Sequence, residues 1–274
     1  MFPLGLSTSG KPLEESLFAA YHAAGITHME LSTNQDAYDT LDFHAVAAMA
    51  RKHDVTLWSV HLPFKPFARI DLSAPDAQLR QSSIDFLSEL IRRAADAGFP
   101  RYTVHPSAVL PADADRAERM ALARDSLHQL SRLAVSCGGT LMVENMIPTC
   151  LGRNIAEMLE LLNAAPELRS TFDTNHLIGE DPVDYIHAIG DRLLSTHVSD
   201  YDRVWEKHWL PGEGCGDFHG IINALREVGY NGPWMYEIGF KASETMPRSR
   251  DLTCEDFAQN AQALFTGKQP PRIK

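Results

Sequence analysis

The stretch Thr140-Leu-Met-Val-Glu144 decides the fold class, because it is a short apolar run that ends in a carboxylate. Two later stretches, Ser170-Thr-Phe-Asp173 and Leu193-Leu-Ser-Thr-His197, also end in a metal-capable side chain. Short runs that are apolar almost throughout are typical of strands buried on both faces, as in a parallel sheet. A polar residue at the carboxyl end of such a strand occupies the usual position of a functional group in a barrel.

The same pattern recurs along the chain and predicts eight strands. We expect them at residues 4–7, 27–31, 56–60, 102–105, 140–144, 170–173, 193–197 and 234–237. Segments with helical periodicity follow them; in the first, Leu13, Leu17 and Tyr21 share one face and Gly25 ends the helix. The count of eight, without a glycine-rich dinucleotide turn after the first strand, favours an α/β fold of one (β/α)8 TIM barrel over an open doubly wound sheet.

Length and composition fit a single domain. The chain has 274 residues, the usual size of such a barrel, and 44% of them are hydrophobic, enough for a large core. No linker or low-complexity tract marks a second domain, so we expect the barrel to span residues 1–267. Residues 268–274 form a C-terminal tail with two prolines and three basic residues, and we expect it to fray or to dock on a neighbouring element.

The balance of charged residues argues against a broad nucleic-acid surface. The chain has 25 Lys and Arg against 36 Asp and Glu, a formal net charge of −11, which repels phosphate backbones without excluding a local basic groove. The four cysteines lack the Cys-x-x-Cys spacing of a thiolate metal site. Because the sequence shows neither a signal-peptide pattern nor an apolar run long enough to cross a membrane, we expect a cytoplasmic protein without membrane attachment.

Metal-capable side chains end six of the expected strands. They are His61, His105, Glu144, Asp173, His197 and Glu237. The carboxyl ends of parallel strands converge on one face of a barrel, so these groups should meet there, where a buried carboxylate must be paired, protonated or bound to a cation. Each could instead be a hydrogen-bonded structural residue, and Glu144 could pair with Arg153, but six coincidences at the same end are a poor explanation. Two Glu, one Asp and one His without sulfur suit Mn²⁺, Mg²⁺, Co²⁺ or Zn²⁺, and the sequence does not choose among these ions.

These residues lie in short motifs: Val143-Glu-Asn145, Asp173-Thr-Asn-His176, His197-Val-Ser-Asp200, and His208-Trp-Leu-Pro-Gly-Glu-Gly214 followed by Asp217-Phe218. The motifs resemble those of the xylose-isomerase-like barrels, a superfamily that includes sugar isomerases, sugar epimerases and the endonuclease IV nucleases. The resemblance runs from the first strand to Glu237. Taken in order, the motifs are specific for the superfamily and much less so for a substrate.

The resemblance to the sugar enzymes implies the role of each site residue. One divalent metal ion is expected on Glu144, Asp173, His197 and Glu237. Glu144 and Glu237 are also expected to be catalytic and to move protons through an enediolate. The expected substrate-binding residues are His61, His105, His176, Arg203 and His208; Arg203 and His208 are alternatives for one contact. The implied activity is that of a metal-dependent sugar, sugar-acid or polyol isomerase or epimerase in carbohydrate metabolism, with a small sugar or polyol as substrate. Barrels of this type often form homo-oligomers.

Two other activities remain open. A metal-dependent dehydratase or lyase acting on a polyol could use the same residues. An endonuclease-IV-like zinc phosphodiesterase would hold three zinc ions, and the chain has side chains at nearly all of those positions, although Glu206 stands where the nucleases have Asp. The position of four aromatic residues is also open. They could line the bottom of a sugar pocket, or they could belong to the core or a lid: Trp58, Trp205, Trp209 and Phe64.

Overall fold

A computed structural model describes residues 1–110 and 113–273. The strands are β1 (Leu4–Ser7), β2 (His28–Leu31), β3 (Thr56–His61), β4 (Arg101–Val104), β5 (Thr140–Glu144), β6 (Arg169–Asp173), β7 (Leu193–His197) and β8 (Trp234–Tyr236). They form one eight-stranded parallel sheet in the order β7-β6-β5-β4-β3-β2-β1-β8. The eight strands expected from the sequence are confirmed, each end within one residue of its predicted position.

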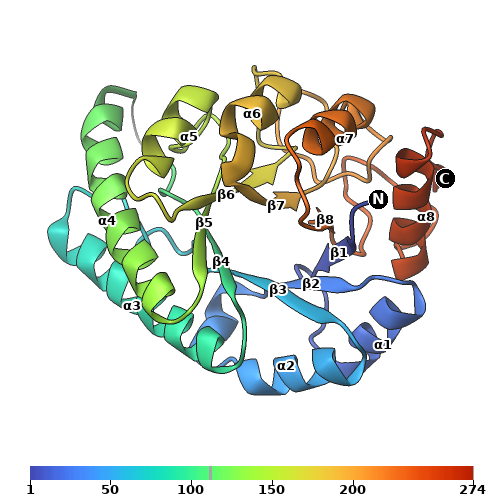
Figure 1. Ribbon diagram of the computed structural model, residues 1–274, viewed down its shortest axis with the longest axis horizontal. Helices are drawn as coiled ribbons and strands as arrows, with labels where there is room; N and C mark the ends of the chain where they lie inside the picture. The colour runs from blue at the N-terminus through green and yellow to red at the C-terminus, as the bar shows by residue number, and fades with distance from the viewer. Residues whose placement is uncertain (111–112, 274) are drawn as a thin grey trace.

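The sheet closes on itself just beyond β7. The Val198 N–H donates to Met235 O at 2.7 Å, and the Glu237 N–H donates to Val198 O at 3.3 Å. These bonds pair Val198 with Tyr236 in parallel and join the two outer strands of the sheet. The result is the nearly closed (β/α)8 barrel of Figure 1, with the helices arranged around the ring of strands.

The helices that cover the barrel are α1 (Glu15–Ala23), α2 (Phe43–Lys52), α3 (Ala77–Asp96), α4 (Arg116–Ser136), α5 (Ile155–Leu162), α6 (Pro182–Ile189), α7 (Phe218–Glu227) and α8 (Cys254–Phe265). Several begin at a residue whose side chain caps the helix. Asn154 Oδ1 accepts from the Glu157 N–H at 2.9 Å, Asp181 caps α6, and Asp217 caps α7. Such a cap satisfies a backbone donor that the helix leaves free, which fixes where the helix starts.

One hydrophobic cluster of buried side chains joins the strands to the helices around them. Its largest fully buried members include Trp234, Tyr236, Phe172 and Tyr185. Two 3-10 turns, η1 (Gln35–Asp39) and η3 (Gly190–Arg192), lie in the connections, and a third, η2 (Asp113–Asp115), precedes α4. Within residues 1–110 and 113–273, no helix combines the length and the apolar character needed to cross a membrane.

The C-terminal tail docks on the loop after β7. Pro270 is buried, and the Arg272 guanidinium donates to Gly212 O at 3.4 Å. The last residue of the tail, Lys274, lies outside the described residues. The boundary of the barrel at residue 267 stays a prediction.

Candidate active site

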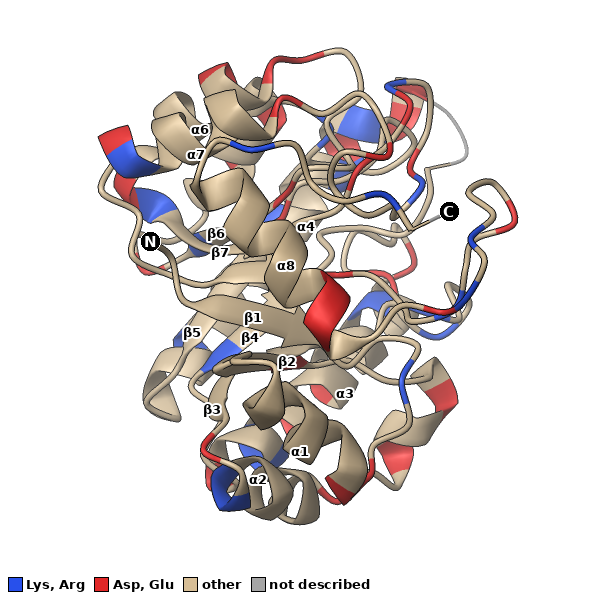
Figure 2. Ribbon diagram, turned by 90° about the vertical axis from the view of Figure 1, so that its right-hand side faces the viewer, with Lys and Arg blue, Asp and Glu red and all other residues tan. Residues whose placement is uncertain are grey.

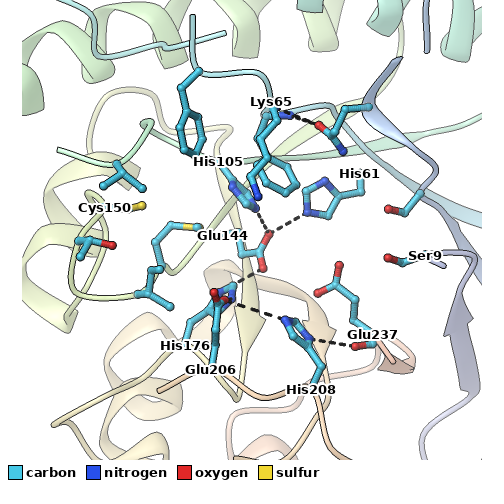
Figure 3. Close-up of a pocket in the computed structure, with 18 of the residues that line it drawn as sticks. Ser9, His61, Lys65, His105, Glu144, Cys150, His176, Glu206, His208 and Glu237 are labelled. Atoms are coloured by element: carbon cyan, nitrogen blue, oxygen red, sulfur yellow. Dashed lines mark hydrogen bonds and ion pairs between the residues drawn. The ribbon is translucent and has the colours of Figure 1, made fainter. Parts of the chain in front are cut away.

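Four of the predicted residues meet at the carboxyl ends of the last four strands. Glu144 ends β5, Asp173 ends β6, His197 ends β7, and Glu237 directly follows β8. One side-chain N or O atom from each of the four lies within 4.8 Å of those from the others. His197 Nδ1 is 3.0 Å from Glu144 Oε1 and 3.2 Å from Glu237 Oε2. Figure 3 shows the side chains of Glu144 and Glu237 extending toward each other in the pocket.

Backbone contacts hold the strand ends in register at this point. The Asn145 side chain accepts from the Asp173 N–H at 2.8 Å and donates to Asp173 O at 2.9 Å, which ties β5 to β6. On the other side of the barrel, the buried ammonium of Lys11 donates to Ser7 O at 2.8 Å and to Ile238 O at 2.6 Å. These contacts fix the backbone next to Glu144, Asp173 and Glu237, so the carboxylates are positioned by rigid elements of the fold.

Asp173 has a buried carboxylate oxygen that lacks a hydrogen-bond partner among the described residues. The residue is 0% exposed, and its Oδ1 accepts from the Asn175 N–H at 2.6 Å. Its Oδ2 has no hydrogen-bond partner among the described residues; the nearest cationic groups are His176 Nδ1 at 3.6 Å and His197 Nδ1 at 4.0 Å. Burial raises the pKa of Asp173 to about 6. A buried carboxylate oxygen without a donor, beside two more carboxylates and an imidazole, fits a divalent cation.

The buried charges of Glu144 and His197 depend on each other. Burial opposes ionisation of Glu144, but the charge of His197 and the hydrogen bond from His105 hold its pKa well below its usual range. Burial likewise opposes charge on His197, yet the carboxylates of Glu30, Glu237 and Glu144 raise its pKa well above the ordinary value. The alternative partner of Glu144 is engaged elsewhere, because Arg153 pairs with Asp113 and Glu157, each at 3.2 Å. Imidazolium groups therefore supply the positive charge that the carboxylates need.

Glu30 belongs to the same cluster, although its position in the sequence did not mark it. It lies in β2, is 0% exposed, and places Oε1 2.8 Å from His197 Nε2. The two atoms are close but not aligned, so neither has a well-directed hydrogen bond within the described chain. Glu30 Oε2 accepts from Ser59 Oγ at 2.8 Å and from Thr103 Oγ1 at 3.1 Å. A carboxylate behind the imidazole orients the ring so that Nδ1 faces the other carboxylates.

His61 and His105 share one oxygen of Glu144. The Nε2 atom of each lies 3.2 Å from Glu144 Oε2. Burial works against a charge on His61, but the hydrogen bond to Glu144 raises its pKa to about 9, whereas burial lowers the pKa of His105. His61 therefore holds the extra proton of this pair at neutral pH, and His105 stays neutral. Both residues line the pocket, as Figure 3 shows.

A second group of polar side chains lines the pocket beside the first. His176 Nε2 lies 3.2 Å from Glu206 Oε2, and His208 Nε2 lies 4.0 Å from the same atom. Despite burial, the charge of Asp173 raises the pKa of His176 to about 10. Of the two alternatives for a substrate contact, His208 lines the pocket, whereas the exposed Arg203 donates from Nε to Cys215 O at 3.2 Å. The substrate contacts of the five predicted residues stay predictions.

A cavity of about 760 Å³ opens at this end of the barrel. Phe64 and Trp205 line it. Trp58 instead donates from Nε1 to Ser195 Oγ at 3.2 Å, and Trp209 donates to Thr245 Oγ1 at 3.0 Å. The open question about the aromatic residues thus has a divided answer: two face the cavity, and two are engaged with other parts of the barrel.

The fold and the site together define a TIM barrel with carboxylates and imidazoles gathered at the carboxyl ends of its strands. Residues 18–253 match the family described as xylose isomerase-like TIM barrel, and the chain belongs to that family. A fructoselysine 3-epimerase from Shigella flexneri is 25% identical over 198 residues, which are 66% of this chain and 70% of that protein. An inosose dehydratase from Clostridium beijerinckii is 28% identical over 136 residues, 42% of this chain and 45% of that protein.

A solved structure supports the fold over nearly the whole chain. The 3-keto-D-glucoside 4-epimerase of E. coli matches with a TM-score of 0.78 at 16% sequence identity, covering 97% of this chain and 100% of that one. At this level of identity the likeness concerns the fold alone. The family resemblance expected from the motifs is confirmed by the match over residues 18–253.

Proposed function

We propose that the protein is a divalent-metal-dependent sugar epimerase or isomerase that works through an enediolate. The observation that carries this proposal is the buried Asp173 Oδ2, which has no hydrogen-bond partner among the described residues and lies beside Glu144, His197 and Glu237. Glu144 and Glu237 also line the cavity. The sequence relative supports the sugar chemistry, because the fructoselysine 3-epimerase is a sugar epimerase.

Glu144, Asp173, His197 and Glu237 would hold the metal ion. When bound, such an ion polarises the substrate carbonyl and offsets the negative charge of the enediolate. Glu144 and Glu237 contact His197 Nδ1 from separate strands, at 3.0 and 3.2 Å. One carboxylate removes the proton from the carbon next to the carbonyl, and the other, in its acid form, returns a proton to the opposite face. The configuration of that carbon is then inverted with no net gain or loss of atoms.

The histidines around the two glutamates would orient the sugar hydroxyls. Glu144 raises the pKa of His61 to about 9 and Asp173 raises that of His176 to about 10, so both rings carry N–H groups that can donate to sugar hydroxyls. His105 is neutral and can accept or donate, depending on the hydroxyl it meets. Lys65 is the only Lys or Arg among the described residues that line the cavity. This lining suits an uncharged polyhydroxyl substrate better than a phosphorylated one.

The zinc phosphodiesterase alternative is favoured by one observation. Two further groups could hold ions, His61 with Glu144 and His197, and His176 with Glu206 and His208. Against it stands the single lysine in the cavity lining. Figure 2 also shows Lys and Arg interspersed with Asp and Glu along the ribbon in that view, and the formal net charge of −11 disfavours a phosphate backbone. Metal analysis of the purified protein separates the two activities: we expect one ion per chain, and three zinc ions per chain would favour the phosphodiesterase.

The decisive test is exchange of a substrate C–H proton with solvent deuterium, measured by NMR on a panel of ketohexoses and 3-keto glycosides. We expect Glu144→Gln and Glu237→Gln to slow exchange by about 10²- to 10⁴-fold, because each removes a proton-transfer group. Glu244→Gln changes an exposed glutamate on the loop after β8 and serves as the control. Undiminished exchange in either active-site variant would remove that residue from the mechanism. Loss of water from the substrate would instead identify a dehydratase.

A further inference from the structure

The cavity has two chemically different sides. The loops after β1, β2 and β8 contribute small and polar residues: Ser9, Gly10, Ser32, Thr33, Gln35 and Gly239. The loops after β3, β4 and β5 contribute six apolar side chains, Phe64, Phe67, Val109, Met146, Ile147 and Cys150, together with the polar Lys65, Ser107 and Thr149. In the view of Figure 3, Glu144 lies between Cys150 on one side and Ser9 and Glu237 on the other. The reacting centre therefore sits where a polar surface meets an apolar one.

Apolar side chains at the mouth of the cavity are left open to solvent. Phe67 is 37% exposed, Val109 45% and Trp205 40%. They are three of the seven large hydrophobic residues that are exposed in the described part of the chain, and all three line this one cavity. Single exposed hydrophobic residues are ordinary on a protein surface, but a group of them on one concave rim marks a binding surface.

The apolar side continues directly from the site histidines. The Phe64 ring stacks on His105 with centroids 4.1 Å apart and an interplanar angle of 23°. The centroids of the Phe64 and His61 rings are 5.6 Å apart. The Lys65 ammonium lies 5.3 Å from the centre of the Phe64 ring and 5.9 Å from that of Phe67. Phe64 thus links the site histidines to the exposed Phe67, with the Lys65 ammonium packed over both aromatic rings.

The size and lining of the cavity set the class of ligand. Its volume of about 760 Å³ lies within the range of sites that hold drug-sized molecules. A free sugar has hydroxyl groups at both ends, and those placed against Phe67, Val109 and Ile147 would lose hydrogen bonds to water without replacing them. A ligand with one polyhydroxyl end and one apolar end satisfies both sides.

We infer that the substrate is a keto-sugar with an apolar substituent, an aryl or alkyl glycoside. The sugar lies toward the loops after β1, β2 and β8, and the substituent packs against Phe67, Val109 and Ile147. This inference rests on the proposed function, because the reacting carbon is placed between Glu144 and Glu237. It adds the substituent and the residues that recognise it.

Binding of two unreactive glycosides tests the inference without any turnover. Phenyl β-D-glucoside and methyl β-D-glucoside are titrated by calorimetry into the protein loaded with Mn²⁺. We expect the phenyl glycoside to bind about tenfold more tightly, since its ring covers apolar surface that a methyl group leaves in water. Phe67→Ser and Val109→Ser should each reduce that preference severalfold. Val135→Ser changes a residue on α4 that is 52% exposed and does not line the cavity, so it should leave the preference unchanged.

Equal binding of the two glycosides, or a preference that survives both rim substitutions, would overturn the inference. A change of oligomeric state in Val109→Ser with the phenyl preference intact would also overturn it, because the rim would then be an interface between copies of the chain. Failure of the proposed function gives a different result: the 3-keto forms of both glycosides would exchange no C–H proton with solvent, whichever glycoside binds more tightly.

Discussion

At the scale of single residues, the imidazole of His197 has carboxylates on both of its nitrogen atoms. Nε2 lies 2.8 Å from Glu30 Oε1, and Nδ1 lies 3.0 Å from Glu144 Oε1. Glu30 holds a proton on Nε2. When the imidazolium loses its other proton, from Nδ1, the Nδ1 lone pair is therefore free to bind a metal ion. Glu30 is therefore a positioning residue for His197, and it is not among the described residues that line the cavity.

The role of Glu30 can be measured through metal affinity. We expect Glu30→Gln to weaken Mn²⁺ binding by about 10- to 100-fold at neutral pH, because the amide no longer stabilises a proton on Nε2. Competition with a chelator measures the affinity, and circular dichroism checks that the fold is retained. Ser59→Ala removes only one hydrogen bond to Glu30 and should have a smaller effect. An affinity unchanged in Glu30→Gln would show that the carboxylate does not tune His197.

Position in the sequence predicts the strand-end residues of the site but not Glu30. Glu144, Asp173 and His197 are the last residues of apolar strands, where a parallel barrel places its functional groups. Glu30 is the third residue of the four-residue strand β2, and side chains on a strand alternate between the two faces. Whether it points into the barrel or outward depends on the closure of the sheet, which no local pattern encodes.

Local sequence patterns also could not decide whether Arg203 or His208 lines the cavity. Both residues have positive φ, 62° and 52°, a left-handed backbone that non-glycine residues adopt uncommonly. Such residues reverse the direction of a loop, so their side chains do not follow any periodic rule. The strands and helix caps, by contrast, follow from hydrophobic spacing and from residues such as Asn154, and these parts of the fold were predictable.

At the scale of elements, Asp200 organises the loop that follows β7. Its carboxylate is fully buried and accepts from four backbone N–H groups, those of Tyr201, Gly212, Gly214 and Gly216, at 2.8 to 2.9 Å. A side chain at Gly214 would meet Tyr201 O and the Asp200 carboxylate, so the close approach requires glycine there. The segment Gly212-Glu-Gly214 is thus wrapped around the buried Asp200 carboxylate.

Replacing Asp200 tests how much this anion stabilises the loop. Asp200→Asn turns an acceptor with two oxygens into a group with one oxygen and an N–H₂ donor that faces backbone donors. We expect a loss of roughly 2–4 kcal/mol in the free energy of unfolding, measured by urea denaturation. Asp217→Asn is the matched control, because Asn caps a helix as well as Asp does, and its loss should stay near zero. Equal losses in the two variants would contradict a special role for Asp200.

At the scale of the whole molecule, the buried carboxylates of the site destabilise the folded state. The chain carries a formal charge of −11, and Glu30, Glu144 and Asp173 are all 0% exposed at one end of the barrel. The pKa of Asp173 is raised from 3.8 to about 6, so the folded state binds this proton more tightly than the unfolded chain. Ionisation of Asp173 therefore weakens folding: the stability linked to this proton is fully present below the ordinary pKa and is lost as pH rises through about 6.

Because the ionised Asp173 carboxylate destabilises the fold, we predict that metal binding reverses the order of stability of the wild type and the Asp173→Asn variant. With EDTA present at pH 7, we expect Asp173→Asn to be more stable than the wild type by on the order of 1–3 kcal/mol, because the amide is nearly isosteric and uncharged. At pH 4 the difference should largely disappear, since the wild-type carboxyl group is then protonated when folded. Mn²⁺ at about 100 times its Kd should add about 2.7 kcal/mol to the wild type and little to the variant. Denaturation curves with and without Mn²⁺ measure both effects, and a variant that is less stable than the wild type under every condition would show that Asp173 serves the fold instead of a cation.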